Sequence, residues 1–192
     1  MAAPEVGVLA LQGDVREHLR LLESCGARVR TVRLAEELPG LQGLVIPGGE
    51  STTMSRLIQQ FRLEAPLQEA FQEGTGCLTT CAGTILAARE IRDGLPDQLQ
   101  LGILDIVVRR NAFGRQLESG ELELQIPAIG TDPIRVALIR APSIEEVGPE
   151  VEVLASYQGQ PAAVRQGRHL GLIFHPEITG DPRLHRLFLS GL

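Results

Sequence analysis

The stretch Val6-Gly7-Val8-Leu9-Ala10-Leu11 is apolar at every position, without the alternation expected of a strand that has one face in water. A strand of this kind is buried on both faces, as the strands of a parallel sheet are. Further strand-like runs follow at 28–32, 41–46 and 77–80, with helical patterns between them. This βαβα series predicts an α/β fold, with an open, mostly parallel twisted sheet that carries helices on both faces.

The second half of the chain has a different pattern. From Gly102 onward, short strand-like runs are separated by turn residues. We expect these runs to form antiparallel hairpins added to the same sheet or its edge, within one domain over residues 1–192. Asp14 and Glu17 have the spacing of a capping box at the start of the first helix. The expected strands cover 103–108, 121–126, 134–139, 151–157, 162–166 and 169–174, and further helices are expected from Ser51 and over 65–73, 82–92 and 181–189.

The composition limits the classes of partner. The chain has 192 residues, 43% of them hydrophobic, and its net charge is -6. Scattered arginines among an excess of acids argue against a nucleic-acid surface. No apolar run approaches the roughly 20 residues of a membrane span, and the start lacks a secretory signal pattern, so we expect no membrane contact and a cytoplasmic location. In that reducing compartment Cys25, Cys77 and Cys81 are not expected to form disulfides.

Cys81 is the candidate nucleophile. It stands where a buried strand turns into a helix, and the small residues Ala82 and Gly83 follow it. This strand-turn-helix form is that of a nucleophile elbow, which would project the sulfur at the carboxyl edge of the sheet, where open α/β sheets bind ligands. The first amides and the dipole of the helix favour the thiolate. On spacing alone, a small cysteine packed under the helix remains the alternative, and we interpret Cys77 and Cys25 as packing residues.

A thiol nucleophile needs a base, and the segment Phe174-His175-Pro176-Glu177 offers one. Pro176 favours an extended backbone at His175, and side chains two residues apart in an extended chain point to the same side. The carboxylate of Glu177 can therefore fix the tautomer and orientation of the His175 ring. A loop histidine with a satisfied hydrogen bond is the alternative. The other histidines neighbour arginines or acids, and we interpret them as solvated: His18, His169 and His185.

Acyl transfer also needs donors for the developing oxyanion. The segment Pro47-Gly48-Gly49-Glu50-Ser51-Thr52-Thr53 follows a strand, and Gly48 and Gly49 let backbone N–H groups approach a ligand closely. A phosphate-binding loop is a competitor, but no Lys follows in the spacing of a Walker loop and Glu50 would repel phosphate. An oxyanion loop fits better, and an ordinary tight turn with Ser51 as N-cap is the simplest alternative.

With this nucleophile, base and glycine loop in one chain, the sequence resembles the class I, or triad-type, glutamine amidotransferases. It is most similar to the glutaminase subunits of pyridoxal 5′-phosphate synthase, and the segments that carry the resemblance span almost the whole chain in order. They are Gly7-Val8-Leu9-Ala10-Leu11-Gln12-Gly13, Pro47 to Thr53, Cys81-Ala82-Gly83, Arg110-Asn111-Ala112-Phe113-Gly114-Arg115-Gln116, Ile139-Arg140-Ala141-Pro142 and Phe174 to Glu177.

The resemblance implies a role for each matching residue. Cys81 attacks the carboxamide of L-glutamine, His175 serves as base and then acid, and Glu177 orients His175. Ammonia leaves, and water hydrolyses the γ-glutamyl thioester to glutamate without a cofactor or metal. The oxyanion is held by main-chain N–H groups around Gly48, Gly49 and Ala82, and the residues that contact glutamine are Gly49, Glu50, Ser51, Arg110, Ile139 and Arg140.

The resemblance also implies a partner. The ammonia passes to a separate (β/α)8-barrel synthase subunit, which makes pyridoxal 5′-phosphate from a pentose phosphate and a triose phosphate. Two alternatives stay open: the glutaminase of another amidotransferase, such as imidazole glycerol phosphate synthase, or a non-catalytic regulatory subunit. The second alternative arises because Thr79 stands where the elbow usually has glycine. Its branched side chain predicts either a relaxed turn or a neighbour reduced in size to make room.

Overall fold

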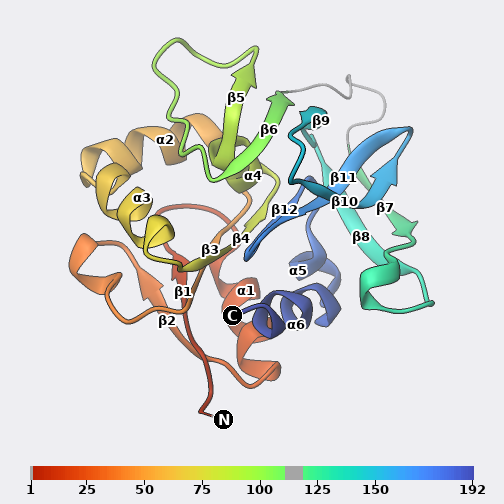
Figure 1. Ribbon diagram of the computed structural model, residues 1–192, viewed down its shortest axis with the longest axis horizontal. Helices are drawn as coiled ribbons and strands as arrows, with labels where there is room; N and C mark the ends of the chain where they lie inside the picture. The colour runs from red at the N-terminus through yellow and green to blue at the C-terminus, as the bar shows by residue number, and fades with distance from the viewer. Residues whose placement is uncertain (1, 111–118) are drawn as a thin grey trace.

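The structure, a computed structural model, describes residues 2–110 and 119–192 (Figure 1). Residues 111–118, which include most of the segment from Arg110 to Gln116, lie outside the described residues. A 7-stranded sheet in the order β10-β11-β12-β4-β3-β1-β2 forms the centre, and the neighbours from β12 to β2 pair in parallel. Its strands are β1 (Glu5–Leu9), β2 (Arg28–Val32), β3 (Gly43–Ile46), β4 (Gly76–Thr80), β10 (Glu152–Tyr157), β11 (Gln160–Gln166) and β12 (His169–Leu172). The expected α/β architecture is confirmed.

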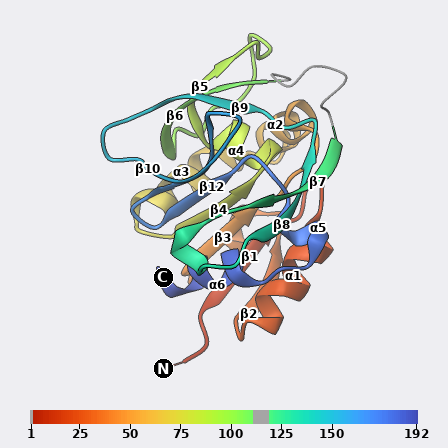
Figure 2. The same ribbon diagram turned by 90° about the vertical axis from the view of Figure 1, so that its right-hand side faces the viewer.

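Helices cover both faces of this sheet, as Figures 1 and 2 show. Two core clusters lie on its two faces: α2 and α3 contribute to one, and α1 and α6 to the other. None of the helices among the described residues combines the length and apolarity needed to cross a membrane. The helices are α1 (Val15–Ser24), α2 (Ser51–Gln60), α3 (Glu64–Gln72), α4 (Ala82–Ala87), α5 (Pro176–Thr179) and α6 (Arg183–Ser190), with short 3-10 turns η1 (Ala35–Glu37) and η2 (Pro127–Ile129).

The strand β3 shows why the apolar runs predict a sheet with two covered faces. Leu44 and Ile46 belong to the cluster under α2 and α3, whereas Val45 belongs to the cluster under α1 and α6. All three side chains are fully buried, because successive residues of a strand point to opposite faces and both faces carry helices. Shortening a side chain such as Leu44 to alanine is expected to cost about 2–5 kcal/mol of stability.

The strand-like runs of the second half do not all join the central sheet. The hairpin of β10 and β11 extends it, as expected, but β5 (Ala88–Arg92), β6 (Leu104–Arg109) and β9 (Ser143–Val147) form a separate sheet. A further pair, β7 (Ser119–Leu124) and β8 (Ile134–Ile139), stands apart from both. The expectation that all hairpins extend one sheet is therefore wrong for these strands.

The expected helix over 82–92 is also too long. The helix α4 ends at Ala87, and Ala88 turns to an extended conformation with φ -64° and ψ 152°. From there the chain continues as β5, which pairs in parallel with β6. The segment from Ala88 to Arg92 contains good helix formers, so pairing with β6 overrides the local helix propensity.

Candidate active site

Three adjacent strands bring the predicted reactive segments together. Cys81 directly follows β4, Gly48 and Gly49 follow β3, and His175 comes shortly after β12. Because β4 lies between β3 and β12 and all three run in parallel, their carboxyl ends meet at one edge of the sheet. The structure therefore places the predicted nucleophile, the predicted base and the glycine loop side by side, where open α/β sheets bind their ligands.

Cys81 adopts the backbone conformation of a strained elbow. Its φ is 45° and its ψ is -104°, a region that costs a residue with a side chain about 1–3 kcal/mol. Backbone bonds hold it there: Cys81 N donates to Leu172 O at 2.8 Å, and Thr84 N donates to Cys81 O at 3.1 Å. Gly83 is required because a Cβ at this position would lie 2.1 Å from Ile46 O. The sulfur itself lies 3.7 Å from Ile139 O.

Thr79 fits beneath this elbow without relaxing it. Gly171 stands directly opposite Thr79 in β12, and a Cβ on Gly171 would lie 2.6 Å from Leu104 and 3.5 Å from the methyl group of Thr84. The hydroxyl of Thr79 is buried and lies 2.8 Å from that of Thr84, which in turn donates to Leu172 O at 2.7 Å. Of the two expected outcomes, a relaxed turn is not seen: Cys81 keeps its strained conformation, and the three atoms nearest a Cβ on Gly171 do not belong to Thr79.

The ring of His175 is held between carboxylates and the nucleophile. Its Nδ1 lies 2.7 Å from Glu177 Oε1 and 3.3 Å from Asp14 Oδ2, and both His175 and Glu177 are buried. Burial by itself would lower the pKa of His175, but hydrogen bonds with Asp14, Cys81 and Glu177 raise it to about 12. Because Nδ1 is engaged by carboxylates, Nε2 is the nitrogen left to exchange a proton with the Cys81 sulfur.

Asp14 does not form the expected capping box. It occupies the N-cap position of α1, but its side chain makes no capping hydrogen bond. The carboxylate instead pairs with His175. The sequence signal for a helix start at this residue is correct, whereas the contact with the ring depends on a segment about 160 residues away and could not be read locally.

Glu177 is surrounded by hydrogen-bond donors that the sequence did not reveal. Burial alone would raise the pKa of this carboxyl, but the charge of His18 and the hydrogen bonds from His175 and His18 hold it well below its usual range. His18 Nε2 lies 3.4 Å from Glu177 Oε1. The interpretation of His18 and His185 as solvated is wrong, since both are fully buried. It is also wrong for His169, which is partly buried with its ring edge-on to Phe71.

The glycine loop packs tightly against the base. A Cβ on Gly48 would lie 2.2 Å from His175 Cε1, so this position requires glycine. Asp14 N donates to Gly48 O at 3.4 Å, and Glu50 N donates to Gln12 Oε1 at 2.7 Å, which fixes the loop from the opposite side. On the other side of the nucleophile, Ala82 begins α4, and the first amides of a helix are not used by its internal hydrogen bonds. The backbone N–H of Ala82 therefore makes no hydrogen bond within the helix.

The residue that caps α2 is Glu50, and the reading of Ser51 as the N-cap is wrong. The carboxylate of Glu50 accepts from Thr52 N at 3.1 Å and from Thr53 N at 2.7 Å. Burial raises the pKa of Glu50, but hydrogen bonds from Thr53 and Thr52 lower it to about 2. The capping bonds keep this carboxylate charged at the helix N-terminus, which its dipole favours.

Gln98 links two of the predicted contact residues and was not singled out from the sequence. Its amide nitrogen donates to Ser51 Oγ at 3.2 Å, and its amide oxygen accepts from Arg110 Nη1 at 2.9 Å. Arg110 also lies 3.6 Å from Glu50. No motif marks Gln98, because its function as a bridge follows from the chain path after α4.

A cavity of about 330 Å³ lies among the predicted site residues, near the lower end of the ~300–1,000 Å³ range of ligand pockets. Gly48 is not part of its lining, since it lies behind the His175 ring. The predicted site residues that line the cavity are Gly49, Glu50, Ser51, Cys81, Ala82, Arg110, Ile139, Arg140 and His175. The rest of the wall is formed by Gln12, Asp14, Ile85 and Ile178.

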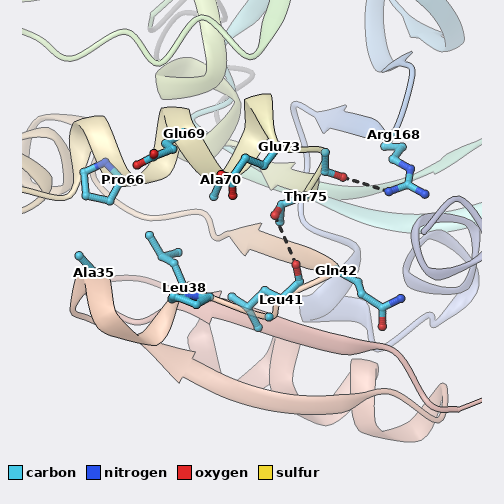
Figure 3. Close-up of a pocket in the computed structure, with 13 residues that line it drawn as sticks. Ala35, Leu38, Leu41, Gln42, Pro66, Glu69, Ala70, Glu73, Thr75 and Arg168 are labelled. Carbon is cyan, nitrogen blue, oxygen red and sulfur yellow. Dashed lines mark hydrogen bonds between the residues drawn. The ribbon is translucent and has the colours of Figure 1, made fainter.

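A larger cavity of about 430 Å³ lies at the opposite, amino edge of the sheet. Figure 3 shows it between α3 and the segment after η1, where Thr75 Oγ1 donates to Leu41 O and Arg168 donates to Gly74 O. Its lining contains neither cysteine nor histidine and none of the predicted site residues. The smaller cavity is therefore the candidate active site.

The carboxylates beside His175 also raise the question of a metal. Asp14, His175 and Glu177 each place one potential ligand atom within 4.8 Å of the others. However, the His175 nitrogen in this group is Nδ1, which shares a proton with both carboxylates. Binding a cation would require loss of that proton, which the raised pKa of His175 opposes. The arrangement fits a hydrogen-bonded histidine better than a metal site.

Comparisons with known proteins identify the family of the chain. The model of the SNO glutamine amidotransferase family matches residues 8–192. The chain is 55% identical over 188 residues to the pyridoxal 5'-phosphate synthase subunit PdxT of Clavibacter michiganensis subsp. michiganensis, which covers 97% of this chain and 90% of that protein. It is 52% identical to PdxT of Frankia alni over 190 residues, or 99% and 96% of the two chains. A crystal structure of a glutamine amidotransferase matches with a TM-score of 0.90 and 47% identity over 97% of each chain. The chain therefore belongs to the SNO glutamine amidotransferase family.

Proposed function

We propose that this chain is the glutaminase subunit of a pyridoxal 5′-phosphate synthase and hydrolyses L-glutamine to L-glutamate and ammonia. The observation that carries the proposal is the contact of a strained, cavity-lining Cys81 with a His175 ring that is anchored by Glu177. Family membership and relatives named as subunits of that synthase support it.

The reaction begins with Cys81 and His175 as a thiolate–imidazolium pair, because the raised pKa of His175 keeps a proton on Nε2 as well as on Nδ1. The thiolate then attacks the side-chain carboxamide carbon of glutamine, and the carbonyl electrons move to the oxygen. Main-chain N–H groups of Gly49 and Ala82, with Gly48 supporting the loop, stabilise this oxyanion. The positive charge left on His175 is balanced by Glu177, which stays ionised because its pKa is held low.

Collapse of the tetrahedral intermediate completes the first half of the reaction. The C–N bond breaks, His175 returns its proton to the nitrogen, and ammonia leaves behind a γ-glutamyl thioester on Cys81. Water then gives a proton to His175 and attacks the thioester, and glutamate is released as the Cys81 thiolate leaves, which restores the starting ion pair. The overall balance is glutamine plus water to glutamate plus ammonia, with no redox change.

The wall of the cavity suits the head of a free amino acid, which carries one ammonium and one carboxylate. Glu50 offers an acid and Arg110 a guanidinium, and both line the cavity together with Gly49, Ser51, Ile139 and Arg140. The ion pair between Glu50 and Arg110 and the bridge through Gln98 hold these groups in place before substrate binds. We infer that these residues contact glutamine.

We further propose that the ammonia passes to a (β/α)8-barrel synthase subunit in the cytoplasm. The names of the relatives support a synthase partner. The free cysteines Cys25, Cys77 and Cys81 are consistent with a reducing compartment. We expect the isolated chain to be weakly active and the synthase to stimulate it, and equal turnover alone and in complex would contradict that expectation.

The test is glutamate release from glutamine, measured with and without a cognate synthase. We expect Cys81→Ala to abolish it. Cys77→Ala is the matched control, because Cys77 is fully buried in β4, and burial raises the pKa of its thiol far above the usual range. It should retain activity. Turnover that survives Cys81→Ala would remove Cys81 from its role, and an inactive wild type with the synthase present would favour a regulatory subunit.

A further inference from the structure

Two buried histidines stand behind the predicted triad and are not explained by the reaction steps. His18 comes from α1 and His185 from α6, and both side chains are fully buried. His18 Nδ1 lies 2.9 Å from His185 Nε2, and the two ring centroids are 5.2 Å apart. On its other side, His18 Nε2 lies 3.3 Å from Thr80 Oγ1 and 3.4 Å from Glu177 Oε1.

The hydrogen positions in this group follow from its acceptors. A carboxylate only accepts hydrogen bonds, so the His18 nitrogen that faces Glu177, Nε2, carries a hydrogen. Burial, followed by the charge of His18, lowers the pKa of His185 to about 3, so His185 is neutral. His18 Nδ1 is in turn held at 2.9 Å from His185 Nε2, so a buried partner contacts each nitrogen of the His18 ring.

The Glu177 oxygen that lies next to His18 Nε2 is also the oxygen that anchors His175. Glu177 Oε1 lies 2.7 Å from His175 Nδ1, and Thr80 Oγ1 also donates to it at 3.5 Å. Three donors from different parts of the chain thus fix one oxygen of a carboxylate that is only 4% exposed. Without His18, the carboxylate could rotate about its side-chain bonds and release the His175 ring from its orientation.

We propose that His18 is a positioning residue that acts through Glu177 on His175, with His185 and Thr80 fixing its ring. This inference rests on the proposed glutaminase function and deepens it, because it assigns a role in turnover to residues outside the cavity. His18 does not line the cavity and touches no substrate. Its removal is therefore expected to lower kcat and leave the KM for glutamine unchanged.

The test compares two amide replacements of nearly equal size and polarity. The side-chain nitrogen of His18→Gln can stand where Nε2 stands and donate to Glu177. The side-chain nitrogen of His18→Asn corresponds to Nδ1 and reaches only towards His185. We expect His18→Gln to keep kcat within about three-fold of wild type and His18→Asn to lose about ten-fold to a hundred-fold, the range seen when supporting partners of active-site groups are removed. His169→Leu, which removes a histidine far from Glu177, is the control and should keep wild-type kcat.

A second readout does not depend on turnover. In the NMR spectrum, the Nδ1 proton of His175 is expected as a separate downfield signal, because it is held in a short hydrogen bond to a buried carboxylate. We expect this signal in wild type and His18→Gln and its loss by exchange in His18→Asn. Thr80→Val, which removes a single hydroxyl, should weaken it and lower kcat about three-fold even if His18→Asn does not fold.

The outcomes separate this inference from the proposed function. If wild type with its synthase does not hydrolyse glutamine, the proposed function fails, whereas the NMR signal still reports on the positioning of His175. If wild type is active and His18→Gln and His18→Asn have the same kcat and the same His175 signal, the positioning role is refuted. A rise in KM without a fall in kcat would refute it as well.

Discussion

The close packing of the glycine loop against His175 gives the sharpest prediction, and the perturbation is Gly48→Ala. A Cβ on Gly48 would lie 2.2 Å from Cε1 and 2.8 Å from Nδ1 of His175, where ordinary contact begins at 3.4 Å. Ring and loop must therefore separate by about 1 Å, and misplacement on that scale typically costs about a hundred-fold in rate. We expect kcat to fall about a hundred-fold, or about 2.7 kcal/mol in activation free energy.

The ring cannot escape this contact without losing its anchor. Its Nδ1 is held at 2.7 Å from Glu177, and a shift of ~1 Å away from that oxygen would end the hydrogen bond. The KM for glutamine should change less than kcat, because Gly48 does not line the cavity.

The assay is steady-state glutamate release with the synthase present. The control is Gly120→Ala in β7, where no atom lies within 4 Å of the added Cβ, so activity should be unchanged. A kcat of Gly48→Ala within about two-fold of wild type would refute the reasoning, since the clash would then be relieved without cost to the base.

Two further predictions concern stability. Thr79→Gly removes the hydroxyl bonded to Thr84 and places a glycine in β4. We therefore expect the free energy of unfolding to fall by about 1–3 kcal/mol, while kcat stays within a few-fold of wild type. Equal urea midpoints for wild type and variant would contradict this expectation. Glu177 has a folded-state pKa below its usual value, so it contributes stability above its unfolded pKa of roughly 4.3 and loses that contribution as the pH falls towards the folded value. Glu177→Gln should therefore lose stability less steeply than wild type between about pH 5 and pH 2 in urea titrations, and parallel curves would show that Glu177 is not the group involved.

The parts of the fold and site that the sequence predicts are those written in local patterns. Strand-like runs predicted the parallel strands, and each predicted reactive segment follows such a run directly or after a short connection. Parallel strands end at a common edge, so a location of Cys81, His175 and the glycine loop at that edge could be expected. That their strands are neighbours could not be expected, because the order of strands within the sheet depends on crossovers that these patterns do not contain.

The histidines behind Glu177 show where local reading fails. His18 lies between charged neighbours in sequence, Arg16 and Glu17 before it and Arg20 after it, which suggested an exposed face. Yet His18 and Leu22 are four residues apart on one face of α1, and both are fully buried. That spacing was the available signal. The partner His185 comes from α6, 167 residues later, and no local pattern announces the pair.

The geometry between nucleophile and base is set by backbone pairing that both share. Leu172 O at the end of β12 accepts from Cys81 N at 2.8 Å, and three residues later the same segment presents His175. His175 N in turn donates to Ala137 O at 2.8 Å, in the strand whose last residue, Ile139, faces the Cys81 sulfur. Two backbone hydrogen bonds and the contact of the Cys81 sulfur with Ile139 O thus form a closed path from the elbow to His175 and back. Strain at Cys81 persists because releasing it would break this path at several points, which is how a local cost of about 1–3 kcal/mol is retained in a folded chain.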